Sequence, residues 1–341
     1  MADATLPTSI PRIPYGEIID SSGNPIPEGA HRFGEALRTI GFVVLADPPF
    51  RSDLLDANFE LARQVFDLGP AQLTEHYAYP EIGFQRGYMP TLIERGFLCG
   101  GDPDEKEVMC FGSFHNVPIA EVPDYLPTAE TYYAACQGIG YNLVKALSLY
   151  LDPEGNERDY MLALFRDKEG TPLDDSHMRH LKYPGDAELM ACQHTDINII
   201  TLLPAATRSG LQVQRNDGAW LPLTPVKGDL IVNAGDMLNF MSGGKIRSTL
   251  HQVVNPTPDP SKPRYSMPFF YHPDHGQVVK VLDSCTGLPK EGRRFPYDQK
   301  LGYHLLYEVL HGIQQIPEEV TAEEFTTEMM RWREEGLPKR G

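Results

Sequence analysis

The sequence predicts a protein of the α+β class, mainly β with added helices, in which a sandwich or jelly-roll barrel forms the core. Between about residues 178 and 282, short runs of Val, Ile, Leu and Phe are separated by Gly, Pro, Asn and Asp, as in closely spaced strands. On both sides of this stretch the apolar residues recur at helical spacing. No repeat, low-complexity tract or linker divides the chain. We therefore expect one domain, with an N-terminal helical and β region at 1–177, the core at 178–282 and C-terminal helices at 283–341.

The N-terminal region is expected to alternate helices with short strands. Residues 31–40 place Phe33, Leu37 and Ile40 on one helical face, and the apolar run that follows at 41–45 predicts a strand. The other elements expected here are an edge segment broken by prolines at 10–15, a helix at 51–68, a loop with a short strand at 83–101, and a long helix at about 128–151.

The core is expected to consist of strands joined by tight turns. The strand-like segments are 197–203, 211–214, 230–233 and 251–254, and the predicted turns are 216–218 and 242–244. Helical spacing returns at 297–315 and 321–335, and these helices would pack outside the barrel.

Composition limits the possible partners. The formal charge of −17 argues against nucleic acid or an anionic membrane, because binding phosphates requires a basic surface. An anionic small molecule would need only one or two local arginines. The N-terminal residues resemble no secretory signal and no apolar run approaches the ~20 residues of a membrane span, so we expect a soluble, cytoplasmic protein. The oligomeric state cannot be read from the sequence.

The five cysteines do not suggest a structural framework. They are odd in number, widely scattered and without a C-x-x-C pair, so neither a disulfide framework nor a structural zinc site is expected. Cys192 lies two residues before His194 and would share its side of an extended strand. We expect it to line a pocket, with a role as a metal ligand as the less favoured alternative.

Three residues form a candidate metal site. His194 and Asp196 are two residues apart in an apolar run, so on a strand both side chains face the same way. His251 would reach them from another strand after the turn at 242–244. Two imidazoles and one carboxylate can hold an octahedral Fe(II) and leave further positions open. An H-x-D step alone is a weak signal, and His251 taken alone is better explained as a partly buried histidine bonded to backbone.

A second pair of residues strengthens this interpretation. Arg264 and Ser266 follow His251 and share one face of a predicted strand, so a guanidinium and a hydroxyl would point at one carboxylate. The alternative is a solvated arginine at the end of a hairpin. The run that follows, 267–272, is apolar enough to be buried, and a buried arginine needs an anionic partner.

The order of these and other motifs resembles the Fe(II)- and 2-oxoglutarate-dependent dioxygenases of the isopenicillin N synthase-like superfamily. The resemblance covers nearly the whole chain, and the joint order of the motifs is far more specific than any one of them. The matching segments are Ile10-Pro-Arg-Ile-Pro, Gly41-Phe42, Arg86-Gly-Tyr-Met-Pro90, Lys106-Glu107, Tyr183-Pro184, His194-Thr-Asp196, Gly210-Leu-Gln-Val213, Gly218-Ala-Trp220, Gly228-Asp-Leu-Ile-Val-Asn233, Gly235-Asp236, His251-Gln-Val-Val-Asn255 and Arg264-x-Ser266.

The resemblance implies a double-stranded β-helix (jelly-roll) core with flanking N- and C-terminal helices. It implies that His194, Asp196 and His251 bind Fe(II), while Arg264, Ser266 and Tyr183 bind the distal carboxylate of the cosubstrate 2-oxoglutarate. The expected reaction uses O2 to oxidise an unactivated C–H bond by hydroxylation, desaturation or ring formation, with succinate and CO2 as coproducts. Ascorbate could support the enzyme in vitro. Relatives often carry Asn two residues before the tyrosine, where this chain has Leu181, so the amide contact that this Asn would make to the cosubstrate is not expected here.

Further residues are candidates for the substrate pocket. Strand alternation places Phe270 and His272 on the side of Arg264, beyond the cosubstrate. Arg179 falls near the expected entrance and could bind a carboxylate, with a surface ion pair as the alternative. Asn198 shares the face of the metal ligands, although a hydrogen bond within the core would serve equally well. Arg86 and Tyr88 are assigned to a loop covering the site.

Two other functional interpretations stay open. An oxidase like isopenicillin N synthase would place its substrate carboxylate in the Arg–Ser site and use no 2-oxoglutarate, and the run from Arg264 to Phe270 is close to that enzyme's own. A jelly-roll binding module without iron is disfavoured because all three candidate ligands are present. The substrate is expected to be a small molecule, either amino-acid-derived or a secondary metabolite, which rests on family analogy.

Overall fold

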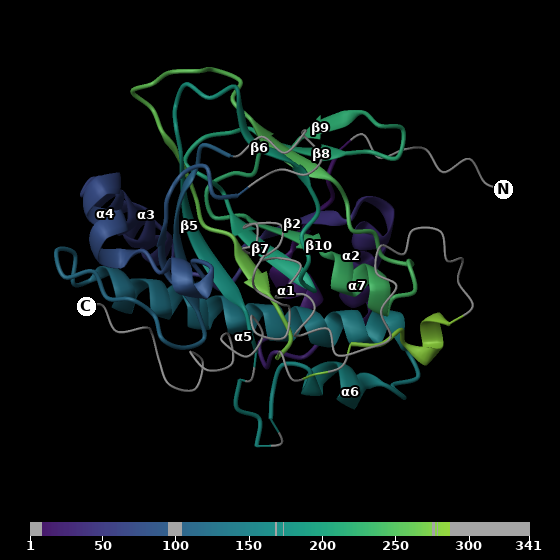
Figure 1. Ribbon diagram of the computed structural model, residues 1–341. Coiled ribbons are helices and arrows are strands. Elements are labelled where there is room, and N and C mark those ends of the chain that lie inside the picture. Colours follow the sequence, from purple (N-terminus) through teal and green to yellow (C-terminus); the bar gives the residue numbers. More distant parts are fainter. Residues whose placement is uncertain are drawn as a thin grey trace, which may run out of the picture.

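The computed structural model describes residues 9–94, 104–167, 169–172, 174–274, 277 and 279–286 (Figure 1). Helices dominate the first part of the chain. They are α1 (Tyr15–Ile18), α2 (Pro27–Ile40), α3 (Ser52–Phe66), α4 (Pro70–Tyr77), α5 (Tyr125–Leu151) and α6 (Arg158–Ala163). The short strands among them are β1 (Arg12–Pro14), β2 (Phe42–Ala46), β3 (Gly87–Met89) and β4 (Glu107–Gly112).

Strands dominate from residue 177 onward, as expected. They are β5 (His177–Tyr183), β6 (Leu189–His194), β7 (Ile200–Pro204), β8 (Leu211–Gln214), β9 (Trp220–Pro222), β10 (Leu230–Ala234), β11 (His251–Val254), β12 (Arg264–Ser266) and β13 (Phe269–Tyr271). One helix, α7 (Asp236–Met241), interrupts them, and 3-10 turns lie at Pro80–Ile82 and Asp283–Cys285. The helices predicted at 297–315 and 321–335 fall outside the described residues.

Two sheets form the core. The larger has nine strands in the order β1-β2-β10-β7-β13-β5-β4-β3, with β12 also pairing with β5. The smaller has the order β6-β11-β8-β9. Because β1 to β4 belong to the larger sheet, the strands of the region before residue 177 are part of the core sheet, while its helices pack outside that sheet. In the described part of the chain, no helix has the length and apolar character needed to cross a membrane.

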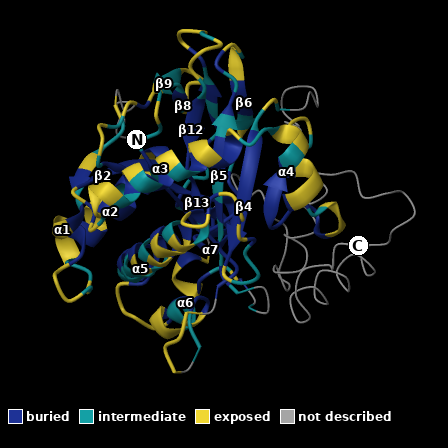
Figure 2. Ribbon diagram, turned by 90° about the vertical axis from the view of Figure 1, so that its left-hand side faces the viewer, coloured by how far each residue is buried: buried dark blue, intermediate teal, exposed yellow. Residues whose placement is uncertain are grey.

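The helices cover the outer face of the larger sheet. The long helix α5 runs across that face and contacts β7 and β13 (Figure 1). A Cβ at Gly34 of α2 would lie 2.1 Å from the ring of Tyr150, so this glycine lets α2 and α5 pack closely. Figure 2 shows the strands mostly buried and the exposed residues along the outer sides of the helices. The helix predicted at 31–40 begins at Pro27, because proline suits the first helical turn.

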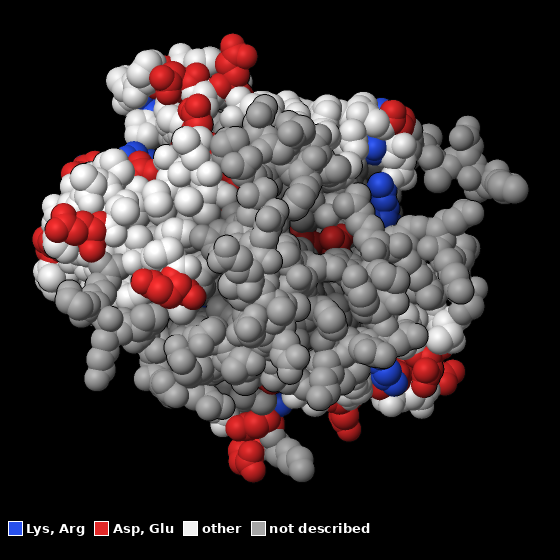
Figure 3. Space-filling view, viewed as in Figure 1, with Lys and Arg blue, Asp and Glu red and all other residues white. Residues whose placement is uncertain are grey.

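Acidic side chains outnumber basic ones on the visible surface. Among the described residues on the face drawn in Figure 3, groups of Asp and Glu lie around the edge, while Lys and Arg show only as small separate spots. This matches the 47 acidic and 30 basic residues of the whole sequence. The described part of this face therefore carries no extended basic patch of the kind that binds a phosphate backbone.

One row of residues crosses the inner face of the larger sheet, and some of its members contact the functional residues described below. Directly paired residues in antiparallel strands point to the same side, so the row can be followed from strand to strand. Its members are Phe42 of β2, Asn233 of β10, Thr201 of β7, Phe270 of β13, His177 of β5 and Gly112 of β4. We call this set the transverse row.

Candidate metal centre

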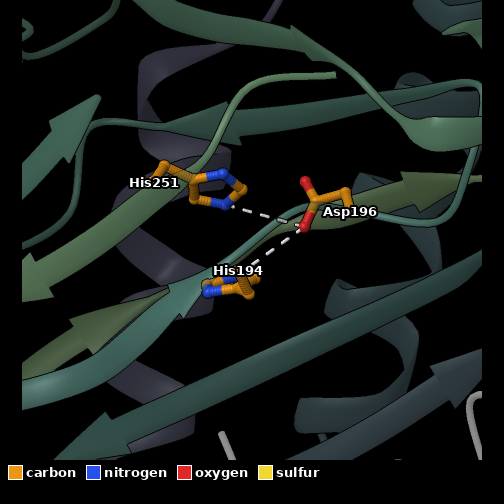
Figure 4. Close-up of side chains that lie close together, drawn as sticks. All are labelled: His194, Asp196 and His251. Carbon is orange, nitrogen blue, oxygen red and sulfur yellow. Dashed lines mark ion pairs between the residues drawn. The ribbon is translucent and has the colours of Figure 1, made fainter. Parts of the chain in front are cut away.

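His194, Asp196 and His251 converge at one point. His194 ends β6 and is directly opposite His251 of β11, while Asp196 lies just beyond the end of β6. The Nε2 atoms of His194 and His251 lie 3.8 Å and 3.6 Å from Oδ1 of Asp196 (Figure 4). One ligand atom from each residue lies within 4.8 Å of the others, which is the spacing of ligands around a single metal ion.

Backbone carbonyls orient both imidazoles. Nδ1 of His194 lies 2.6 Å from the carbonyl oxygen of Cys192, and Nδ1 of His251 lies 3.1 Å from that of Thr249. A carbonyl oxygen can only accept, so both Nδ1 atoms carry the proton and both Nε2 atoms keep a free lone pair. This is the usual way in which proteins fix the tautomer of a metal-binding histidine.

The Asp196 carboxylate is held by two members of the transverse row. Its Oδ2 accepts hydrogen bonds from Thr201 Oγ1 and from Asn233 Nδ2, the latter at 2.7 Å. Burial is the largest influence on the pKa of Asp196 and raises it, but the two histidines and these two hydrogen bonds outweigh burial and lower the pKa overall. The carboxylate is therefore ionised and presents Oδ1 toward the histidines.

Other residues lie behind these. Asn198 is fully buried and donates from Nδ2 to Thr201 Oγ1 at 2.8 Å, so its observed hydrogen bond runs to the residue that supports Asp196. Asp236 accepts from Thr195 Oγ1 at 3.0 Å, and its backbone N–H donates to the carbonyl of Asp196 at 2.8 Å. The sequence singled out 235–236 as a matching motif but gave Thr201 and Asn233 no role.

One side of this centre is open. The side chain of His194 is 45% exposed, whereas those of Asp196 and His251 are buried. Burial first, and then the neighbouring His251, lower the pKa of His194 to about 4, with Asp196 opposing them. A neutral imidazole is the form that binds a metal. The ring of Phe42, in the transverse row, packs edge-on against His251 at 5.4 Å between ring centres.

Arg264, Ser266 and Tyr183 form a second group on the inner face. Arg264 of β12 is paired directly with Tyr183 of β5, and Ser266 with Leu181. The Arg264 guanidinium carbon lies 5.2 Å from the centre of the Tyr183 ring. Leu181 is buried and offers no hydrogen bond, so the structure gives that position no polar contact to replace an asparagine.

The Arg264 guanidinium is buried without a carboxylate partner among the described residues. Its Nε donates to the carbonyl of Arg208 at 3.0 Å, while Nη1 is buried and has no hydrogen-bond partner in the described part of the chain. Burial lowers the pKa of Arg264, and Tyr183 opposes this. An orphaned buried cation requires an anion. The donor sets therefore fit Fe(II) at the three ligands and the distal carboxylate of 2-oxoglutarate at Arg264.

The candidate pocket residues divide into three cases. Phe270 is half-buried in the transverse row, and the His272 ring packs on His177 at 5.6 Å between ring centres. Arg179 is on the same face but pairs with Glu94, with 2.5 Å between Nη1 and Oε1. Tyr88 is paired with Met109, on the opposite face from Leu181, and donates to Glu107 at 2.7 Å. The expectation that Tyr88 covers the site is wrong, because the register of β3 turns it away.

Two further residues depart from expectation. Cys192 is disulfide-bonded, to a partner outside the described residues, a single bond that the sequence did not predict. His177, which the sequence did not single out, is half-buried beside His272. Burial, the first cause in each case, lowers the pKa of His272 to about 4 and that of His177 well below its usual value.

Comparison with known proteins agrees with this geometry. The family model of the 2OG-Fe(II) oxygenase superfamily matches residues 174–273, which contain all six predicted metal and cosubstrate residues. A homoarginine-6-hydroxylase of Arabidopsis thaliana is 27% identical over 74% of this chain and 72% of its own length.

Solved structures give the same result for the fold. A 2OG-Fe(II) oxygenase family protein of Caulobacter crescentus superposes with a TM-score of 0.72 at 29% identity, covering 89% of this chain and 99% of that one. A full-length Neurospora crassa protein, solved with α-ketoglutarate (2-oxoglutarate) and 5-formyluracil, has a TM-score of 0.72 at 24% identity, covering 89% and 96%. The predicted fold class, a jelly-roll core with helices, is confirmed.

Proposed function

Because the chain belongs to the 2OG-Fe(II) oxygenase superfamily, we propose that it oxidises an unactivated C–H bond of a small organic substrate, with 2-oxoglutarate and O2 as cosubstrates. The class, a non-haem iron oxygenase dependent on 2-oxoglutarate, follows from the family. Small molecules are what the names of similar proteins describe, homoarginine in one and 5-formyluracil in another. We propose a substrate of secondary or amino-acid metabolism and a cytoplasmic location, both as predictions from the sequence.

Each predicted residue has a defined task in this proposal. His194, Asp196 and His251 hold Fe(II) through Nε2, Oδ1 and Nε2, the atoms that their other hydrogen bonds leave free. Bound iron, with O2 and 2-oxoglutarate, supplies an oxidant strong enough to attack an unactivated C–H bond and yields succinate and CO2. Arg264 and Ser266 orient the cosubstrate by its distal carboxylate, and the Tyr183 hydroxyl adds a hydrogen bond to it. The half-buried face around Phe270 aims the substrate.

The observation that carries the proposal is the contrast between the two polar groups. At the three ligands, every polar atom that does not face the common point is bonded elsewhere. At Arg264, one nitrogen has no partner among the described residues. The first arrangement is complementary to a cation and the second to an anion, as expected where Fe(II) and a dicarboxylate bind together.

The test is release of succinate from 2-oxoglutarate. Purified protein would be incubated with Fe(II), O2, ascorbate and a panel of small molecules, and succinate would be measured beside each oxidised product. We expect equal amounts of succinate and product, with both abolished in His194→Ala. Product that forms with iron and O2 but without any 2-oxoacid would instead support an oxidase like isopenicillin N synthase. A purified protein that takes up no Fe(II) and releases no succinate would support the non-catalytic binding module.

A further inference from the structure

Two arginines on the inner face of β5 and β12 differ in their partners. Arg264 has no carboxylate partner among the described residues. Arg179 also points to this face, four residues before Tyr183 on the same strand, but its guanidinium contacts Glu94 at 2.5 Å. The guanidinium carbon of Arg179 lies 5.6 Å from the centre of the Phe270 ring, at the end of the site assigned to substrate.

Glu94 belongs to a closed network of charges. Its other carboxylate oxygen lies 2.6 Å from Nζ of Lys106, which in turn lies 2.5 Å from Asp104. All four side chains are largely buried, with exposed fractions of 11–17%. The network contains two cations and two carboxylates, so its charges balance without a ligand. Burial is the largest single influence on the pKa of Glu94 and raises it, but the charges and hydrogen bonds of Arg179 and Lys106 together outweigh burial and lower the pKa, so Glu94 is ionised.

This network disfavours a second carboxylate at the substrate end. An acidic substrate that paired with Arg179 would have to displace Glu94 and then lie beside a buried like charge. Arg264 differs, because no carboxylate among the described residues pairs with it, so an anion could bind there without displacing one. The two arginines therefore have different tasks although both are buried on one face.

The other polar groups at the substrate end are two imidazoles and, beside them, one buried guanidinium and one buried carboxylate, Arg86 and Asp175, whose charges act in opposite directions on the pKa of His177. His177 and His272 are half-buried on the inner face, and no hydrogen bond from a described residue reaches their ring nitrogens. A neutral imidazole offers one donor and one acceptor. The pair can therefore recognise an uncharged polar group without any charge from the substrate.

We propose that Glu94 sets the charge selectivity of the substrate end, which takes an uncharged small molecule bearing hydrogen-bond donors and acceptors and excludes a carboxylate. This inference rests on the proposed function and narrows it. In this proposal Glu94 neutralises the charge of Arg179, which then forms part of the pocket wall and does not bind a substrate carboxylate.

The test uses benzoate as a simple carboxylate probe. The Fe(II)-loaded protein, kept anaerobic and saturated with 2-oxoglutarate to fill Arg264, would be titrated with benzoate by calorimetry. We expect no benzoate binding that depends on Arg179, so wild type and Arg179→Gln should give the same result. In Glu94→Gln, Arg179 is released and benzoate affinity should rise about tenfold or more, a gain that Glu94→Gln/Arg179→Gln should abolish.

Two results would overturn the inference. One is benzoate binding to wild type that is lost in Arg179→Gln, and the other is a folded Glu94→Gln that binds benzoate no better than wild type. If Glu94→Gln does not fold, the comparison of wild type with Arg179→Gln decides alone. Failure of the proposed function would look different, because no compound would then cause release of succinate. An acidic compound that causes succinate release in wild type but not in Arg179→Gln would count against the inference alone.

Discussion

Arg264 and Tyr183 face each other across β12 and β5, with the guanidinium 5.2 Å from the centre of the phenol ring. Burial raises the pKa of Tyr183, against the opposing charges of Lys106 and Arg264, so its hydroxyl keeps its proton at neutral pH. A protonated phenol beside a guanidinium gives a carboxylate a neutral and a charged donor together. The pair thus provides a site for an anion.

Replacing Arg264 should weaken 2-oxoglutarate binding and leave metal binding intact. Arg264→Gln removes a charge-assisted bidentate contact, which is worth about 1.5–3 kcal/mol, so the KM for 2-oxoglutarate should rise about 10- to 100-fold. Arg215→Gln is the matched control, because that arginine pairs with Asp217 on the surface. Steady-state titration of 2-oxoglutarate measures both. An unchanged KM in Arg264→Gln would contradict the assigned role.

Replacing Thr201 should weaken metal binding although Thr201 touches no metal. Thr201→Val keeps the shape of the side chain but removes the hydroxyl that donates to Asp196. Loss of such a supporting contact typically costs about 10- to 100-fold in metal affinity. Competition between the protein and a chelator for Fe(II) or Mn(II) gives the affinity. Thr39→Val, on the exposed end of α2, should have no effect, and equal affinities in both variants would rule out support by Thr201.

The stability of the metal-free protein should fall as the pH decreases from about 6.5 toward 3. His180 is buried behind the larger sheet, and burial lowers its pKa to about 3. In this interval the unfolded state binds a proton that the folded state does not, so stability is lost as the pH falls. Denaturant unfolding at a series of pH values measures the slope.

The control for that measurement separates titration from hydrogen bonding. His180→Phe should reduce the slope of stability against pH, because the titrating group is gone. Tyr125→Phe removes only the hydroxyl 2.8 Å from His180 Nδ1 and should keep the slope. The same slope in His180→Phe as in wild type would show that other groups cause the loss.

Two glycine substitutions should change stability in opposite directions. A Cβ at Gly112 would lie 1.9 Å from Arg86 Nη2, and Arg86 is fully buried with hydrogen bonds to two carbonyls. Gly112→Ala should therefore cost about 1–3 kcal/mol, as in other overpacked cores. Gly138, inside α5, has open space around it, so Gly138→Ala should stabilise by about 0.5–1 kcal/mol. Thermal unfolding of both variants tests this contrast.

The sequence predicted those parts of the site that depend on local spacing. His194 with Asp196, and Arg264 with Ser266, are two residues apart, and the alternation of a strand brings each pair to one side. The sequence could not predict Thr201 or Asn233, because their roles depend on which strands are neighbours and in what register. It could not predict Glu94 either, because this residue lies outside the strands and meets Lys106 and Arg179 only in the folded chain. Tyr88 shows the same limit, since alternation tells which residues share a face but not which face points to the site. The helix α7 was missed because all six of its residues are buried and no amphipathic pattern marks it.

Every second side chain from Arg264 to His272 faces the site, so this one segment reaches both of its ends. In the proposed function, Arg264 and Ser266 anchor the oxoacid end, while Phe270 and His272 line the substrate end. Substitutions at 270 and 272 can therefore diversify what is oxidised while the oxidising machinery is inherited unchanged. A change in length is different, because one residue added or lost between β12 and β13 would exchange the inward and outward side chains beyond it. We therefore expect point mutations in this segment to change substrate specificity, and one-residue insertions between β12 and β13 to disrupt the site.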